Sequence, residues 1–176
     1  MAKRRKEPRW LSRVVVDAVH NDQLREHGGL TAIRDENALE SALARPQQEW
    51  HYADEADLAT LAAAYGFGLV NKHPYRDGNK RIGFLAIATF LGINGYELQA
   101  TDHEVVAEIV NLADGRVSEG QLAVWIRGHT EYPRALRRTP ALENRTGFRL
   151  NGAEGEIRTP TGLLQLAPEA EDNEGR

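Results

Sequence analysis

A run of nine residues, His73–Arg81, brings imidazole, acidic and basic side chains together within one short segment. Its sequence is HPYRDGNKR, and apolar segments flank it on both sides. Pro74 cannot extend a preceding helix, and it disfavours helical backbone at His73, so a turn is expected here. Gly78 lets a ligand approach the backbone closely. The pattern predicts a loop that carries reactive side chains into the start of a helix.

The residues that follow this turn predict an anion site. A helix that starts near Asn79 presents N–H groups without intrahelical partners at the positive end of its dipole. Lys80 and Arg81 add positive charge, and a guanidinium can hold a phosphate through two hydrogen bonds. The negative charge of Asp77 would repel an anion unless a cation such as Mg²⁺ were bound between them. We therefore expect a polyphosphate site with magnesium at Asp77, and His73 placed to take a proton from an attacking hydroxyl.

The segments before this loop have the periodicity of helices. Residues 11–27 place apolar side chains on one face, and a Gly-Gly pair ends the pattern. Asp35 is expected to cap a shorter helix that runs to Ala44 and is ended by Pro46. Residues 57–73 are rich in Ala and Leu and open with carboxylates, which helix starts favour.

The helix after the loop is predicted to be the buried centre of the fold. It runs from Asn79 to about Ile93 and has almost no polar face. Gly66 and Gly68 interrupt the preceding helix at some cost in helix propensity. We expect both glycines to mark close packing against another backbone.

Two more helices and one short extended piece complete the prediction. The extended piece is residues 96–99, after an Asn-Gly turn. A helix is expected from Thr101 or Asp102 to Leu112. A last helix, capped by Ser118, is expected to run to about Gly128. No strand pattern is strong enough to support a sheet. The sequence therefore predicts an all-α fold of about six helices.

The composition limits the class of protein. The chain has 176 residues, 41% hydrophobic and 27% charged, which suits one globular domain with tails. It contains no cysteine, so a disulfide framework, a thiolate nucleophile and a cysteine zinc site are excluded. No apolar run approaches the length of a membrane span, and no signal-peptide core follows the basic N-terminus. We expect a soluble, cytoplasmic protein that does not contact a membrane.

Charge separates a middle region from two tails. Residues 1–10 carry a net charge of +4 and residues 153–176 one of −4. The first ten residues are expected to form a basic disordered arm, and without a further basic or aromatic stripe no direct nucleic-acid binding is expected. Residues 131–176 have low hydrophobic density and are expected to be a low-order tail. One domain, residues 11–130, remains.

The segment HPYRDGNKR resembles the signature of the Fic/Doc family, which runs His-Pro-Phe, two residues, Gly-Asn, Gly or Lys, and Arg. The residues upstream resemble the Doc (death-on-curing) branch at Gly28–Leu30, Ile33–Asp35 and Leu39–Pro46. The likeness covers roughly residues 10–130. It implies a Fic-like helical bundle with a buried central helix after the signature.

Two positions decide the branch, and two others depart from the family pattern. AMP-transferring Fic proteins have glycine where this chain has Lys80, and a second arginine where it has Phe84. Both differences resemble Doc, in which the nucleotide lies reversed and the γ-phosphate is transferred. Leu85 replaces an asparagine that the Doc pattern can have, which removes a polar contact from the second helical turn. Tyr75 stands in place of phenylalanine, and its hydroxyl needs a partner if it is buried.

The resemblance implies a role for each residue of the signature. His73 would be the general base, and Asp77 the carboxylate that holds Mg²⁺. The residues implied to bind the phosphates of ATP are Gly78, Asn79, Lys80 and Arg81. The implied activity is that of a toxin in a type II toxin–antitoxin system, a kinase that phosphorylates a threonine of elongation factor Tu and arrests translation. The implied partner is a small Phd-like antitoxin, whose disordered C-terminal segment folds on the toxin as a helix.

Other interpretations stay open at this point. The start of the helix at Asn79 could be only a cap, with Lys80 and Arg81 facing solvent. The family resemblance also allows AMP transfer to a protein, as in the Fic branch. A third hypothesis is a binding module without catalysis, in which Phe84 and Leu85 mark a degenerate site.

Overall fold

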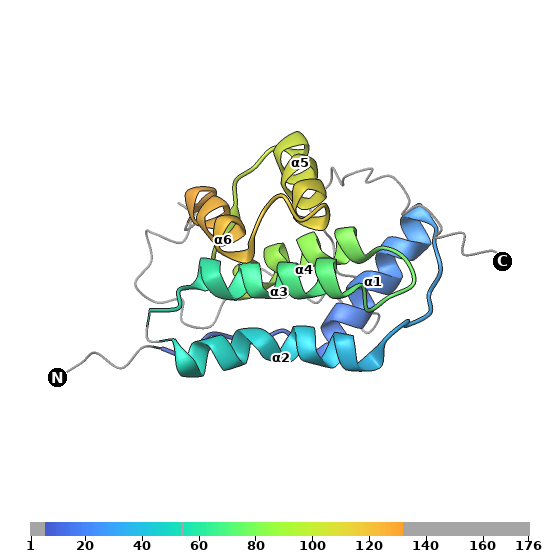
Figure 1. Ribbon diagram of the computed structural model, residues 1–176, viewed down its shortest axis with the longest axis horizontal. Coiled ribbons are helices and arrows are strands. Elements are labelled where there is room, and N and C mark those ends of the chain that lie inside the picture. Colours follow the sequence, from blue (N-terminus) through green and yellow to red (C-terminus); the bar gives the residue numbers. More distant parts are fainter. Residues whose placement is uncertain (1–5, 54, 132–176) are drawn as a thin grey trace, which may run out of the picture.

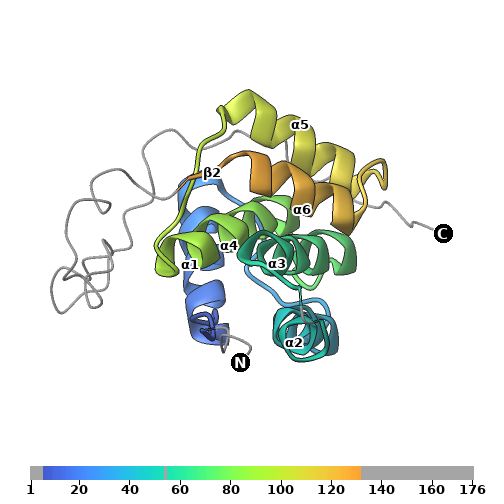
Figure 2. The same ribbon diagram turned by 90° about the vertical axis from the view of Figure 1, so that its left-hand side faces the viewer.

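The computed structural model describes residues 6–53 and 55–131, and these form a bundle of helices in three layers (Figures 1 and 2). Helices α3 and α4 lie side by side in the middle layer, α1 and α2 lie on one side of them, and α5 and α6 lie on the other. The helices are α1 (Arg13–His27), α2 (Glu36–Tyr52), α3 (Leu58–Lys72), α4 (Asn79–Ile93), α5 (Asp102–Ala113) and α6 (Glu119–Gly128). The predicted all-α fold of about six helices is confirmed.

The central pair α3 and α4 is packed backbone to backbone. A Cβ atom added at Gly66 of α3 would lie 2.5 Å from the side chain of Ile87 and 3.6 Å from the carbonyl oxygen of Gly83 in α4. On the other side of α3, a Cβ at Gly68 would lie 3.1 Å from the Cα of Ala42 in α2. Both glycines therefore permit the close packing that the sequence predicted. Ile87 is fully buried, as is much of α4, which is the central helix expected from its apolar sequence.

Helix α2 is longer than its sequence suggested. The helix was predicted to end at Ala44 because of Pro46, but it continues through Pro46 to Tyr52. Proline inside a helix lacks an N–H donor and costs about 3 kcal/mol. Burial of Pro46 and ion pairing of Arg45 with Glu119 of α6 hold the helix against its neighbours at this point. Beyond it, Trp50 packs edge to face on Trp10, with 6.4 Å between ring centroids. These long-range contacts offset the local preference of proline.

Two very short strands close the fold. Strands β1 (Glu97–Leu98) and β2 (Thr130–Glu131) pair in an antiparallel register that sets Leu98 opposite Thr130. The strand β1 lies within the extended piece predicted at 96–99, whereas β2 was not predicted. Strand β2 includes Glu131, so the secondary structure extends one residue beyond the expected domain boundary at 130.

The first described residues contact the body of the protein. Asn94 holds the backbone of Arg9 on both sides, accepting its N–H at 2.8 Å and donating to its carbonyl at 3.0 Å. Trp10 stacks on Phe90 at 6.2 Å. The folded part therefore starts before residue 11. The predictions for residues 1–5 and 132–176 lie outside the described residues. In the part of the chain that the structure describes, no helix has the length and apolar character that a membrane span requires.

Candidate active site

The signature forms a tight loop between the two central helices, and we call residues 73–78 the motif loop. Helix α3 ends at Lys72, and His73 follows in the left-handed conformation, with φ of 47° and ψ of 57°. It is the one non-glycine residue with positive φ in the described ranges. The prediction that Pro74 keeps His73 out of the right-handed helical region is confirmed, and this backbone turns the chain sharply before α4 begins at Asn79.

The loop between α1 and α2 lies beside the motif loop and holds it through the backbone (Figure 1). The carbonyl of Pro74 accepts hydrogen bonds from the N–H groups of Arg34 at 2.7 Å and Asp35 at 3.0 Å. The N–H of Arg76 donates to the carbonyl of Ala32 at 3.0 Å. Two loops distant in sequence therefore share one short ladder, which supports the strained backbone at the start of the motif.

Asn79 braces the motif loop from inside. Its Oδ1 accepts the N–H of Tyr75 at 3.0 Å, and its Nδ2 donates to the carbonyl of Tyr75 at 2.9 Å. The side chain is fully buried. Sequence analysis assigned Asn79 to the phosphates, and the structure places its amide against the loop backbone. Its side chain therefore shapes the site.

Arg81 has the most unusual environment in the first turn of α4. The residue is 7% exposed, yet its guanidinium has no ion pair and no hydrogen bond to any other residue that the structure describes. A buried charge without a partner is costly unless a ligand supplies one. Arg81 is largely buried, so an exposed cap with this side chain on the open surface does not describe that residue. Lys80 beside it is partly exposed.

Asp77 is partly exposed, and its carboxylate is held in place. Oδ1 accepts the N–H of Gly78 at 2.6 Å. Oδ2 lies against the backbone of Gly29, where an added Cβ would approach it to 2.5 Å. Among the described residues, no group of three or more His, Asp and Glu side chains could hold a metal ion by itself. A single carboxylate suits Mg²⁺ that is shared with the phosphates of a nucleotide, because that ion retains water and phosphate ligands.

His20 is a site residue that sequence analysis missed. It lies on the buried face of α1, and its Nε2 is 2.8 Å from the carbonyl oxygen of Asp77. A carbonyl only accepts, so Nε2 carries the proton. The ring stacks on Tyr75, with centroids 3.8 Å apart. Burial lowers the pKa of His20, and the charges of Asp77 and Arg81 act on it in opposite directions. The one signal in the sequence that could have indicated a role for His20 was its place among apolar residues of α1.

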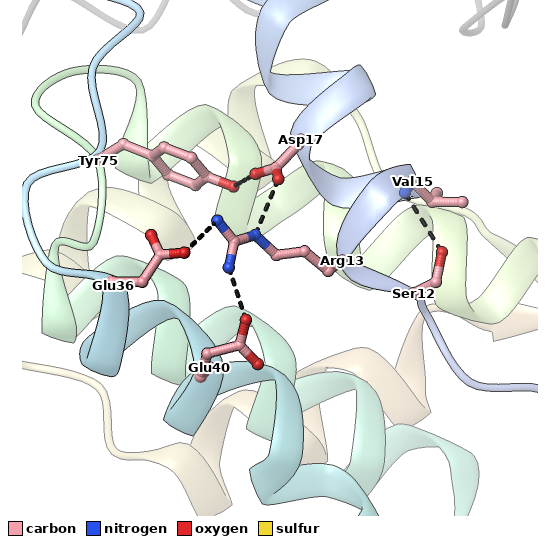
Figure 3. A network of polar contacts seen from close by, with 7 residues as sticks. All are labelled: Ser12, Arg13, Val15, Asp17, Glu36, Glu40 and Tyr75. Atoms are coloured by element: carbon pink, nitrogen blue, oxygen red, sulfur yellow. Dashed lines mark hydrogen bonds and ion pairs between the residues drawn. The ribbon is translucent and has the colours of Figure 1, made fainter.

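The hydroxyl of Tyr75 finds the partner that burial requires. It donates to Oδ1 of Asp17 at 2.6 Å, and Oδ2 of Asp17 accepts from Arg13 at 2.8 Å (Figure 3). Arg13 also pairs with Glu36 at 2.8 Å and Glu40 at 2.6 Å, so its guanidinium joins α1 to α2. Burial raises the pKa of Tyr75, so its hydroxyl stays a donor. The network anchors the motif loop to the N-terminal helices.

Residues 10–91 match the model of the Fic/DOC family. This segment of the chain is similar to the Fic/DOC family. The match runs from just before α1 almost to the end of α4, so it contains the motif loop and the helices that hold it.

Two proteins with Doc names are similar to this chain. "Protein kinase doc" of Escherichia phage P1 is 29% identical over 111 residues, which cover 62% of this chain and 86% of that protein. "Toxin Doc" of Mycolicibacterium smegmatis is 42% identical over 74 residues, which cover 42% of this chain and 57% of that protein. These similarities support the Doc branch of the family, as the sequence predicted.

Two departures from the Fic/DOC pattern lie in the second turn of α4. Leu85 is 4% exposed and belongs to the hydrophobic core. Phe84 is partly exposed and packs against that core. The apolar side chains at both positions therefore contribute to packing, and the charged groups of α4 are confined to its first turn.

Proposed function

We propose that this chain is a Doc-type toxin that transfers the γ-phosphate of ATP to a hydroxyl of a protein. The observation that carries the proposal is the largely buried residue Arg81 at the start of α4, whose guanidinium has no partner among the described residues. A polyphosphate supplies two parallel acceptors for such a group and also meets the first N–H groups of the helix. The names of the two Doc relatives support a toxin and a kinase.

Each residue of the motif has a task in this reaction. His73 takes the proton of the substrate hydroxyl as its oxygen attacks the γ-phosphorus. The bond from the γ-phosphorus to the bridging oxygen breaks, and ADP leaves. Lys80 and Arg81 hold the phosphates and balance the charge that spreads over the transferred group. Asp77 would hold Mg²⁺, which neutralises phosphate charge when it is bound. The work of the protein is chiefly positioning, which suits a site made of one loop and one helical turn.

Two features speak for phosphate transfer over AMP transfer. Phe84 stands where AMP-transferring relatives of the family have a second arginine, and it packs against the core. Lys80 stands where they have glycine, so a long cationic side chain occupies the first turn. The proposed substrate is a threonine of elongation factor Tu, and its modification would arrest translation. The proposed partner is a small Phd-like antitoxin.

Labelled ATP tests the reaction. Purified protein is incubated with elongation factor Tu and Mg²⁺, with ATP labelled either at the γ-phosphate or at the α-phosphate. Transfer of the γ-label alone is expected. Transfer of the α-label would establish AMP transfer in place of phosphate transfer. If neither label were transferred, the result would favour a binding module without catalysis.

His73→Asn tests the general base. Asparagine tolerates left-handed backbone, so this variant removes the imidazole without adding strain at φ of 47°. Loss of a general base lowers the rate of transfer by about 10²–10⁴-fold. Single-turnover transfer of the γ-label measures the effect, and thermal unfolding checks the fold. A variant that still transfers phosphate at the wild-type rate would exclude His73 as the base.

A further inference from the structure

We propose that His20 and Gly29 are positioning residues that together fix the backbone and the carboxylate of Asp77 for magnesium and nucleotide binding. The inference rests on the proposed function, because it assigns a task to residues around the carboxylate that holds Mg²⁺. Neither residue belongs to the signature, and both lie at least 48 positions before Asp77 (77 − 29 = 48). The two residues contact different ends of Asp77.

His20 holds the backbone of Asp77. Its Nε2–H donates to the carbonyl at 2.8 Å, and its ring is stacked on Tyr75 with an interplanar angle of 19°. The residue is 2% exposed, so water does not compete for this hydrogen bond. Beside it, a Cβ at Gly78 would lie 3.4 Å from Nε2, so the ring also packs against the turn that leads into α4. The position of the Asp77 carbonyl is therefore set by α1.

Gly29 bounds the carboxylate of Asp77 on the opposite side. A Cβ atom at Gly29 would lie 2.5 Å from Oδ2 and 3.1 Å from the carboxylate carbon of Asp77. A side chain is excluded there, and the φ of 126° also favours glycine. Oδ1 is meanwhile held by the N–H of Gly78. The carboxylate thus has a defined rotamer, with contacts on both of its oxygens.

Such restraint matters for the metal that the site would hold. Mg²⁺ requires nearly ideal octahedral geometry, so a ligand that moves by a fraction of an ångström binds less well. Residues that orient a metal ligand typically change metal affinity by about 10- to 100-fold when they are replaced. The expected effect of losing His20 or Gly29 therefore falls on the Mg²⁺ dependence of nucleotide binding.

Paired variants of His20 separate the hydrogen bond from the packing. His20→Phe keeps an aromatic ring that can stack on Tyr75 but has no N–H, whereas His20→Gln keeps an N–H donor and has no ring. Binding of the β,γ-imido analogue of ATP is measured by calorimetry over a range of Mg²⁺ concentrations and again with chelator. We expect His20→Phe to need about 10-fold more Mg²⁺ for half-maximal binding, with unchanged affinity in chelator. His20→Gln should stay within about 2-fold of the wild type.

Variants of Gly29 test the other contact on an exposed loop, where folding is less at risk. Gly29→Ala places a methyl group on the Asp77 carboxylate and should also raise the Mg²⁺ requirement by about 10-fold. Gly28→Ala is the matched control. Gly28 has a positive φ of 76° as well, but nothing lies within 4 Å of an added Cβ, so the Mg²⁺ requirement should not change.

Asp77→Asn separates failure of this inference from failure of the proposed function. If Asp77→Asn leaves the Mg²⁺ dependence unchanged, Asp77 does not hold the metal, and the inference and the metal-binding task of Asp77 are overturned, whereas the labelled-ATP experiment still decides the proposed transfer of phosphate. If Asp77→Asn removes the dependence while His20→Phe and Gly29→Ala behave like the wild type, the inference alone is overturned. Equal defects in Gly28→Ala and Gly29→Ala would assign the effect to backbone strain and also overturn it.

Discussion

Five helices of the described residues begin with a polar N-cap side chain, whereas α4 begins with Gly78 in left-handed conformation and has no side chain there. In each of the five, the N-cap side chain accepts the N–H three residues later, and the N-cap residues are Ser12, Asp35, Asp57, Thr101 and Ser118. The start of α4 is held instead by residues from other elements, including His20.

This contrast bears on the proposed phosphate site at the start of α4. A local cap uses up the N–H groups that an anion would need, so a binding site at a helix start requires a start without a cap. The loop must then be stabilised from elsewhere. Here Asn79 braces it from inside, and Tyr75 joins it to Asp17 of α1.

The largest expected effect comes from Arg81→Met, which removes the buried charge and keeps an apolar stem. Affinity for ATP should fall by about 100-fold, equivalent to about 2.7 kcal/mol. The free energy of unfolding without ATP should stay equal or rise by about 1 kcal/mol, since a buried charge without a described partner is removed. Calorimetry and urea unfolding measure the two quantities. Arg76→Met, at an exposed arginine of the same loop, is the control. Lower stability with normal ATP affinity would make Arg81 a structural residue.

Tyr75→Phe tests the long-range support of the motif loop. The change removes the hydrogen bond to Asp17, and a bond to a charged group contributes about 1.5 kcal/mol or more. We expect the free energy of unfolding in urea to fall by about that amount. Tyr52→Phe, at a tyrosine that is 89% exposed, should have no effect. Equal stability of both variants would show that this hydrogen bond does not hold the loop.

Ser118→Ala tests a locally capped helix start. Ser118 and Gln121 form a reciprocal capping box at the start of α6. Loss of an N-cap side chain to alanine typically costs about 1 kcal/mol, whereas loss to glycine costs only a few tenths. Ser118→Gly should therefore unfold at a higher temperature than Ser118→Ala. Both variants should bind ATP with wild-type affinity. A change in ATP affinity would break the distinction between capped helix starts and the start of α4.

The smallest expected effect is the acid sensitivity of the cap at Asp57. Burial alone would raise the pKa of Asp57, but hydrogen bonds from Arg127 and Thr60 outweigh it and lower the pKa from 3.8 to about 2. The folded state therefore favours the charged form, and this stabilisation is present above pH 3.8 and is lost as the pH falls to about 2. The side chains of Asp57 and Arg127 are both about half exposed, so their ion pair contributes well below ~1 kcal/mol to the free energy of unfolding.

Asp57→Asn measures this contribution. Asparagine can still cap α3 but loses the ion pair with Arg127. In urea unfolding, the wild type should be slightly more stable than the variant at pH 7, and the difference should disappear between pH 4 and pH 2. A difference that persists at pH 2 would assign it to something other than the charge of Asp57.

The sequence by itself determined the features that depend on neighbours only a few residues apart. The five N-cap side chains act over three residues, and the apolar periodicity marked each helix, so the starts of these helices were predicted closely, whereas the C-terminal end of α2 was predicted eight residues too early. The signature His73–Arg81 also lies within nine residues, and it identified the loop, the start of α4 and the family. Local hydrogen bonds and short turns need no knowledge of the rest of the chain.

Only the tertiary structure decided the features that depend on packing between distant segments. The local preference of Pro46 predicted the end of a helix. In the structure, contacts with α6 and with the N-terminal segment stabilise α2 beyond Pro46. His20 and Asp17 meet the motif loop across 57 and 58 residues of sequence. No spacing in the sequence encodes such contacts, because they form when α1 packs against α4 and brings its buried face to the loop. The same packing largely buried Arg81 at the start of α4.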